Sequence, residues 1–81
     1  MKFFFTERFE RSYRAAPLEV KRAFAKQAQF LETNLRHPSL KAKKYDEAND
    51  IWQARVNRDW RFYFQMQGDT YYILDLIPHP K

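Results

Sequence analysis

The residues best suited to chemistry in this sequence are two arginines in an aromatic-rich, strand-like stretch. Arg55 and Arg61 lie within residues 50–64, DIWQARVNRDWRFYF, whose pattern predicts two short strands around a turn. Guanidinium groups are preferred partners of phosphate because they form planar bidentate hydrogen bonds. The first hypothesis for this stretch is therefore an anion-binding site.

Alternation along these two strands sorts the side chains by polarity, because successive residues of a strand point to opposite faces. One face collects apolar residues: Trp52, Ala54, Val56, Trp60, Phe62, Phe64 and Met66. The other collects polar residues: Gln53, Arg55, Asn57, Arg61, Tyr63 and Gln65.

A three-residue loop, 57–59, preserves this sorting and pairs Arg55 with Arg61 across the hairpin. Like charges in that position repel, at a cost of roughly 0.2–1 kcal/mol, which a phosphate between them would remove. The alternative is an ordinary solvated face on which Asp75 or Asp59 neutralises one arginine.

A histidine and a lysine-rich segment are available to complete such a site. His79, in LIPHPK, has a side chain that titrates near neutral pH and is suited to donating a proton to a leaving alkoxide; an ordinary exposed tail residue is the alternative. Lys41, Lys43 and Lys44 precede the hairpin, and Tyr63 lies on its polar face. This set suits RNA cleavage by the substrate's own 2′-hydroxyl, where the protein orients phosphate, stabilises charge and moves protons.

Composition excludes several other chemistries. There is no cysteine and only one glycine, so a thiolate nucleophile, a cysteine zinc site and a glycine-rich phosphate loop are absent. Two distant histidines give no metal-ligand spacing, and we expect no metal and no cofactor. The net charge of +5 favours a polyanionic or acidic partner. The chain lacks a membrane-spanning apolar run, so we expect a cytoplasmic protein without a membrane partner.

The order of the expected strands and helices around these residues predicts an α+β fold in one domain, residues 1–81. We expect a short buried strand at 2–5, then a helix capped by Thr6 and reaching about Ala16. A second helix begins at Pro17. Its apolar stripe comprises Val20, Phe24, Ala28, Leu31 and Leu35. Strands at about 51–56, 60–66 and 70–77 then form a three-stranded antiparallel meander, with the αα-hairpin packed on one face.

Four segments occur in a characteristic order along the chain: FTERFERSYRAAP, LRHPSLKAKKY, DIWQARVNRDWRFYF and YYILDLIPHPK. With this ordered set, the chain as a whole resembles the RelE/ParE superfamily of toxins from bacterial type II toxin–antitoxin systems. RelE-like members bind the ribosomal A site and cleave mRNA, whereas ParE-like members poison DNA gyrase. The resemblance implies an acidic antitoxin as a partner, together with the ribosome and mRNA.

For the RelE-like branch, the resemblance implies roles for individual residues. Arg61 matches the arginine that contacts the scissile phosphate, and Arg55 matches a second basic position. Lys41, Lys43 and Lys44 resemble lysines near the substrate, and His79 resembles the proton-transfer histidine of YoeB-like relatives. We expect Arg61→Ala to remove toxicity and leave the fold intact.

The sequence departs from the family pattern in two places. Pro80 follows His79, where many relatives carry a tyrosine nearby, and the acidic base of the YoeB-like branch has no counterpart. A ParE-like gyrase inhibitor without nuclease activity and an inactive member that only binds antitoxin are therefore the alternative interpretations.

Overall fold

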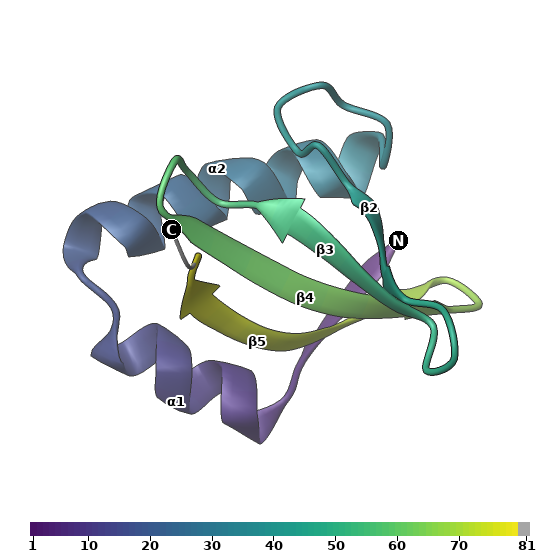
Figure 1. The fold of residues 1–81 in the computed structure, drawn as a ribbon, viewed down its shortest axis with the longest axis horizontal. Helices are drawn as coiled ribbons and strands as arrows, with labels where there is room; N and C mark the ends of the chain where they lie inside the picture. The colour runs from purple at the N-terminus through teal and green to yellow at the C-terminus, as the bar shows by residue number, and fades with distance from the viewer. Residues whose placement is uncertain (80–81) are drawn as a thin grey trace.

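The computed structural model describes residues 1–79 and has the expected α+β architecture; Pro80 and Lys81 lie outside the described residues. The elements in chain order are β1 (Lys2–Phe5), α1 (Glu7–Ala15), α2 (Leu18–Thr33), β2 (Lys43–Asp46), β3 (Ile51–Arg55), β4 (Trp60–Gln67) and β5 (Thr70–Pro78). They build a five-stranded sheet in the order β1-β5-β4-β3-β2. Figure 1 shows α2 crossing behind this sheet and α1 lying along β5.

Two local signals determine where the helices begin. Thr6 caps α1 as predicted, because its hydroxyl oxygen accepts the backbone N–H of Phe9 at 3.2 Å. The same hydroxyl donates to the carbonyl oxygen of Ile73 at 3.0 Å, which ties the start of α1 to β5. Pro17 is the N-cap residue of α2, so the helix begins at Leu18 and not at Pro17 as predicted.

The register of the central hairpin agrees with the sequence prediction. Arg55 pairs with Arg61 and Ala54 with Phe62, and the backbone N–H of Val56 donates to Trp60 at 3.0 Å. At the other end of the sheet, β1 runs parallel to β5, with Phe3 opposite Tyr71. The meander is longer than predicted, because β2 adds a further antiparallel strand beside β3.

The core lies between the sheet and the two helices. Phe62 and Phe64 of β4 are fully buried, and Phe24 of α2 meets Phe62 edge-on with ring centroids 5.1 Å apart. Phe9 of α1 packs on Phe24 at 5.0 Å. No helix within residues 1–79 is both long enough and apolar enough to cross a membrane.

One prediction about burial was wrong and another missed a residue. Strand β1 is not buried: Phe4 is 55% exposed and Phe5 40%, because β1 is an edge strand with a partner on one side only. In α2 the buried residues are Val20, Phe24, Gln27 and Leu31; of the predicted stripe, Ala28 and Leu35 are only partly buried and pack against this core.

Candidate active site

A cavity of about 180 Å³ opens on the polar face of the sheet. Its lining residues are Lys41, Lys43, Gln53, Arg55, Arg61 and His79. Five of the seven residues selected from the sequence therefore meet at one place. They come from the segment before β2, the start of β2, β3, β4 and the chain after β5. Among residues 1–79, four of the lining side chains are cationic and none is a carboxylate, so the cavity is suited to holding an anion.

The two arginines at its centre have no acidic partner among residues 1–79. Asp75, proposed above as a neutralising partner, is occupied elsewhere: it lies 3.1 Å from Arg8 Nε and accepts the Ser12 hydroxyl at 2.6 Å. Asp59 makes no ion pair within the described residues. The interpretation in which Asp75 or Asp59 neutralises one arginine is therefore wrong, and no carboxylate among residues 1–79 compensates the facing pair Arg55 and Arg61.

Arg61 is held more firmly than a free surface arginine. It is half-buried, and its Nη1 donates to the carbonyl oxygens of Asn57 at 2.8 Å and Trp60 at 2.9 Å. These bonds orient the guanidinium and also brace the β3–β4 loop. The expectation that Arg61 contributes little to the fold therefore needs correction, whereas within residues 1–79 no hydrogen bond or ion pair involves the Arg55 side chain.

Lys41 is positioned by a clamp that joins α2, the segment before β2 and the end of β3. The amide of Gln27 donates to the carbonyl oxygens of Ser39 at 2.9 Å and Arg55 at 2.7 Å. Leu40 is fully buried, and its carbonyl oxygen accepts the Arg55 N–H at 2.7 Å. Lys41 follows with a φ of 46°, a left-handed backbone that side-chain-bearing residues rarely adopt. Such strain persists only where surrounding contacts impose it.

His79 reaches the cavity through a backbone contact. Its N–H donates to the carbonyl oxygen of Asp59 at 2.7 Å, which fastens the chain after β5 to the β3–β4 loop. In Figure 1 the end of the described chain lies beside that loop. The imidazole itself is exposed and lines the same cavity as Arg61.

Lys44 and Tyr63 lie outside this cavity. Lys44 faces the other side of the sheet, where it forms an ion pair with Asp50 and its Nζ lies 5.0 Å from the centre of the Trp52 ring. The hydrogen bond to Asp50 raises the pKa of Lys44. Tyr63 stays on the polar face, and its hydroxyl oxygen accepts the Gln53 amide at 2.9 Å beside the cavity.

Two residues that sequence reasoning missed extend or support the site. Lys26 of α2 lines an adjoining cavity of about 360 Å³ that shares Lys41 and Arg55 with the first, so the basic region continues toward α2. Gln27 supplies the clamp. A glutamine within the apolar stripe Val20, Phe24 and Leu31 is itself a detectable signal, because a buried amide needs partners.

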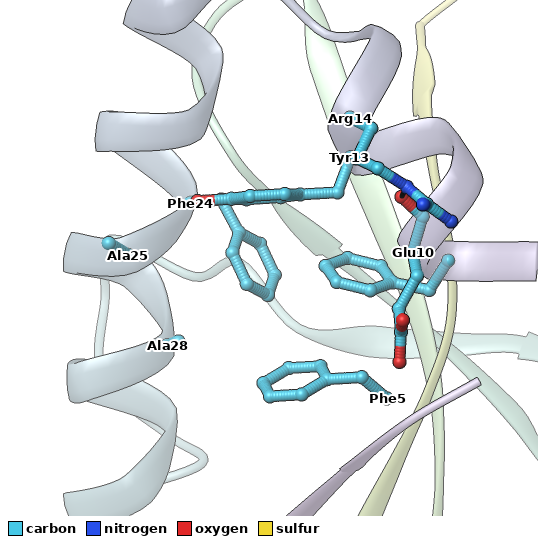
Figure 2. A pocket seen from close by; sticks show the side chains of 8 residues that line it. Phe5, Glu10, Tyr13, Arg14, Phe24, Ala25 and Ala28 are labelled. Atoms are coloured by element: carbon cyan, nitrogen blue, oxygen red, sulfur yellow. Dashed lines mark hydrogen bonds between the residues drawn. The ribbon is translucent and has the colours of Figure 1, made fainter. Parts of the chain in front are cut away.

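Another cavity lies away from these charges. It measures about 500 Å³ and is a groove between α1 and α2. Figure 2 shows Phe24, Ala25 and Ala28 on the same helix, with the rings of Phe5 and Tyr13 turned toward it. Its lining is mainly apolar, so it is suited to a protein partner more than to an anionic substrate.

We find no metal-ligand set in the described part of the chain. No three His, Cys, Asp or Glu side chains among residues 1–79 lie close enough to hold an ion. The chemistry available in the cavity is therefore phosphate binding by guanidinium and ammonium groups, with one imidazole.

Comparison with solved structures identifies the fold. The YoeB/ParE toxin from Agrobacterium tumefaciens superposes with a TM-score of 0.82 at 13% identity, covering 99% of this chain and 100% of that one. The fold is that of the RelE, YoeB and ParE toxins. The archaeal RelE–RelB complex from Pyrococcus horikoshii OT3 gives 0.78 at 18% identity, over 95% of this chain and 92% of that one.

A third solved structure is the YoeB dimer from Staphylococcus aureus, with a TM-score of 0.81 and 12% identity over 99% and 98% of the two chains. No family model matches the sequence, and no curated protein does. At these identities the likeness establishes the fold, and the activity must be argued from the site.

Proposed function

We propose that this protein is the toxin of a type II toxin–antitoxin system and cleaves mRNA on the ribosome. The observation that carries the proposal is the facing pair Arg55 and Arg61, uncompensated within residues 1–79, in a cavity that also holds Lys41, Lys43 and His79. A fold gains no stability from two opposed guanidinium groups, whereas a phosphate between them satisfies both. The shared fold with RelE and YoeB toxins supports the same activity.

In the proposed reaction the 2′-hydroxyl oxygen of the substrate attacks the adjacent phosphorus, and the bond from phosphorus to the 5′ oxygen breaks. Arg61, oriented by the loop carbonyls, stabilises the charge that develops on the phosphate, and Arg55 binds the same group from the facing strand. His79 donates a proton to the leaving 5′ oxygen. The 2′-hydroxyl proton passes to Lys41 or Lys43 in its neutral amine form, because an ammonium group cannot accept it and no carboxylate of residues 1–79 lines the cavity.

The proposed partner is an acidic antitoxin that docks in the groove between α1 and α2. Solved relatives include a RelE–RelB complex and a YoeB–YefM toxin–antitoxin complex. The groove offers apolar rings to an amphipathic segment, with Arg14 lining it and Lys21 5.6 Å above the Tyr13 ring to meet acidic side chains. Ala25→Glu should prevent neutralisation by the co-expressed antitoxin, whereas Ala48→Glu, at an exposed site elsewhere, should not.

The experiment that tests the activity is primer extension on a reporter mRNA in a cell-free translation system. We expect discrete, ribosome-dependent cuts with the native protein, and their loss in Arg55→Ala and Arg61→Ala. Arg58→Ala is the matched control, because Arg58 is exposed in the loop between these two residues and carries the same charge.

Arg55→Ala is the cleaner of the two variants, since no side-chain bond within residues 1–79 depends on Arg55. Uncut mRNA with the native protein would refute the nuclease. Uncut mRNA together with a DNA-damage response in expressing cells would select the gyrase-inhibitor alternative, and harmless expression would select an inactive antitoxin-binding protein.

A further inference from the structure

A second cavity lies on the same polar face of the sheet, next to the cavity that contains Arg55 and Arg61, which is named the phosphate cavity. It measures about 250 Å³ and lies between α1, β2, β3, β4 and β5. Tyr63 lines it, whereas Arg61, two residues earlier on β4, lines the phosphate cavity. Residues i and i+2 of a strand are about 7 Å apart and share a face. A nucleotide whose phosphate contacts Arg61 therefore has its base within reach of this second cavity.

Two tyrosines form one wall of this cavity. Tyr45 of β2 is 61% exposed, and its ring meets Tyr63 edge-on with centroids 4.9 Å apart. Tyr63 is fixed in turn by the hydrogen bond between its hydroxyl and Gln53. Burial in the core does not explain a large aromatic ring held in this exposed orientation. Exposed aromatic faces beside a cationic groove are the means by which proteins stack single-stranded bases.

Arg8 of α1 lines the same cavity with a side chain that is 76% exposed and is paired with Asp75. Asp75 is largely buried and is fixed by three groups: the Ser12 hydroxyl at 2.6 Å, the Leu76 N–H at 2.8 Å and Arg8 Nε at 3.1 Å. The contact through Nε leaves both Nη groups of Arg8 without a hydrogen-bond or ion-pair partner among residues 1–79. Paired Nη groups match the O6 and N7 acceptors of guanine.

We propose that this second cavity binds the nucleobase next to the phosphate held by Arg61, with preference for guanine. Tyr45 stacks on the base, Arg8 contacts its O6 and N7 acceptors, and Asp75 acts as the positioning residue for Arg8. Ile51 and Ile77 provide the apolar floor against which a planar ring packs. The inference rests on the proposed function. It names the residues that would make RNA cleavage depend on the nucleotide sequence.

The test uses two probes so that failure of this inference and failure of the phosphate site are distinguishable. Backbone-amide NMR titrations measure the binding of inorganic phosphate and of 2′-O-methyl pentanucleotides, which lack the attacking hydroxyl. The pentanucleotides are UUGUU, UUAUU and UUUUU. We expect UUGUU to bind about tenfold more tightly than the others, with shifts at both cavities, and phosphate to shift only the cavity around Arg61.

Matched variants distinguish the contribution of base stacking on Tyr45 from that of the Arg8 contact. Tyr45→Ala should weaken the binding of all three oligonucleotides about tenfold, and Tyr45→Phe should restore it, because the ring is retained. Arg8→Lys should abolish the preference for UUGUU, since lysine keeps the charge and loses the paired donors. Arg11→Lys is the control on the same helix, where Arg11 pairs with Glu7 in solvent. None of these variants should alter phosphate binding.

Three results would overturn the inference. They are equal affinity for the three oligonucleotides, native affinity in Tyr45→Ala, or absence of shifts at Tyr45 and Tyr63. If phosphate still binds in any of these cases, the phosphate site stands and only the base subsite is lost. Absence of phosphate binding at Arg61 would instead refute the proposed function, whatever the oligonucleotides do.

Discussion

Replacing Gln27 tests how α2 supports the candidate active site. Replacing it with alanine removes the two hydrogen bonds that join α2 to the carbonyl oxygens of Ser39 and Arg55, at 2.9 and 2.7 Å. A typical intramolecular hydrogen bond contributes about 1 kcal/mol net. The higher helix propensity of alanine offsets only a few tenths of that, about 0.3 kcal/mol. We therefore expect Gln27→Ala to lower the free energy of unfolding by about 2 kcal/mol.

Urea unfolding followed by circular dichroism measures this change. With a slope of about 1–1.5 kcal/mol per molar urea, the midpoint should fall by more than about 1 M. Gln29→Ala is the matched control, because Gln29 lies on the exposed side of the same helix and its side chain makes no hydrogen bond within residues 1–79. That control should leave the midpoint unchanged or slightly raised.

The same substitution should weaken the site before the protein unfolds. The clamp holds the segment that carries Lys41 against the end of β3, so its loss should reduce phosphate affinity under conditions where the protein is still folded. Equal unfolding midpoints for Gln27→Ala and Gln29→Ala would refute the clamp. A lowered midpoint with native phosphate affinity would show that the clamp stabilises the fold without positioning the site.

Three further predictions follow from single residues. Lys41→Gly should leave the thermal midpoint unchanged or raised while lowering phosphate affinity, because glycine adopts the left-handed backbone without the penalty of about 1 kcal/mol that other residues carry there. Lys43→Ala should reduce phosphate affinity, measured by NMR titration, whereas Lys44→Ala should not, since Lys44 faces the other side of the sheet. Burial raises the pKa of Tyr71 above 10.0, so the folded state favours the neutral phenol and stability falls as pH rises past 10. Tyr71→Phe should reduce that fall in urea titrations at high pH, and an unchanged slope would contradict the assignment.

The hairpin at the centre of the site could be predicted from sequence because two constraints agreed. Strand alternation separated the arginines from the aromatic residues, and only the three-residue loop kept Val56 opposite Trp60 and Arg55 opposite Arg61. The order of the other elements followed from equally local signals, such as Thr6 at the start of α1.

Features that depend on distant parts of the chain could not be predicted in this way. Strand β2 has the polar sequence KKYD, and it is a strand because β3 offers it a backbone partner. A bulge between Lys44 and Asp46 also disturbs the alternation there. Lys43 pairs with Gln53 and Lys44 with Trp52, so ordinary strand alternation turns Lys44 away from Lys43, which becomes evident only once this segment is known to be a strand. The arrangement of Arg8, Ser12 and Asp75 joins residues from α1 and β5, which no local pattern brings together.

The parallel pairing of β1 with β5 has a consequence for synthesis of the chain. Residues Lys2–Phe5 have no partner strand until Thr70–Ile73 have been made, and His79 reaches the β3–β4 loop only after that. Pairings between segments so far apart in sequence form late, because the intervening chain must first be ordered. A nascent chain can therefore hold both arginines of the hairpin and still lack a closed sheet and its histidine. The activity proposed above would then arise only after β5 and His79 have been synthesised.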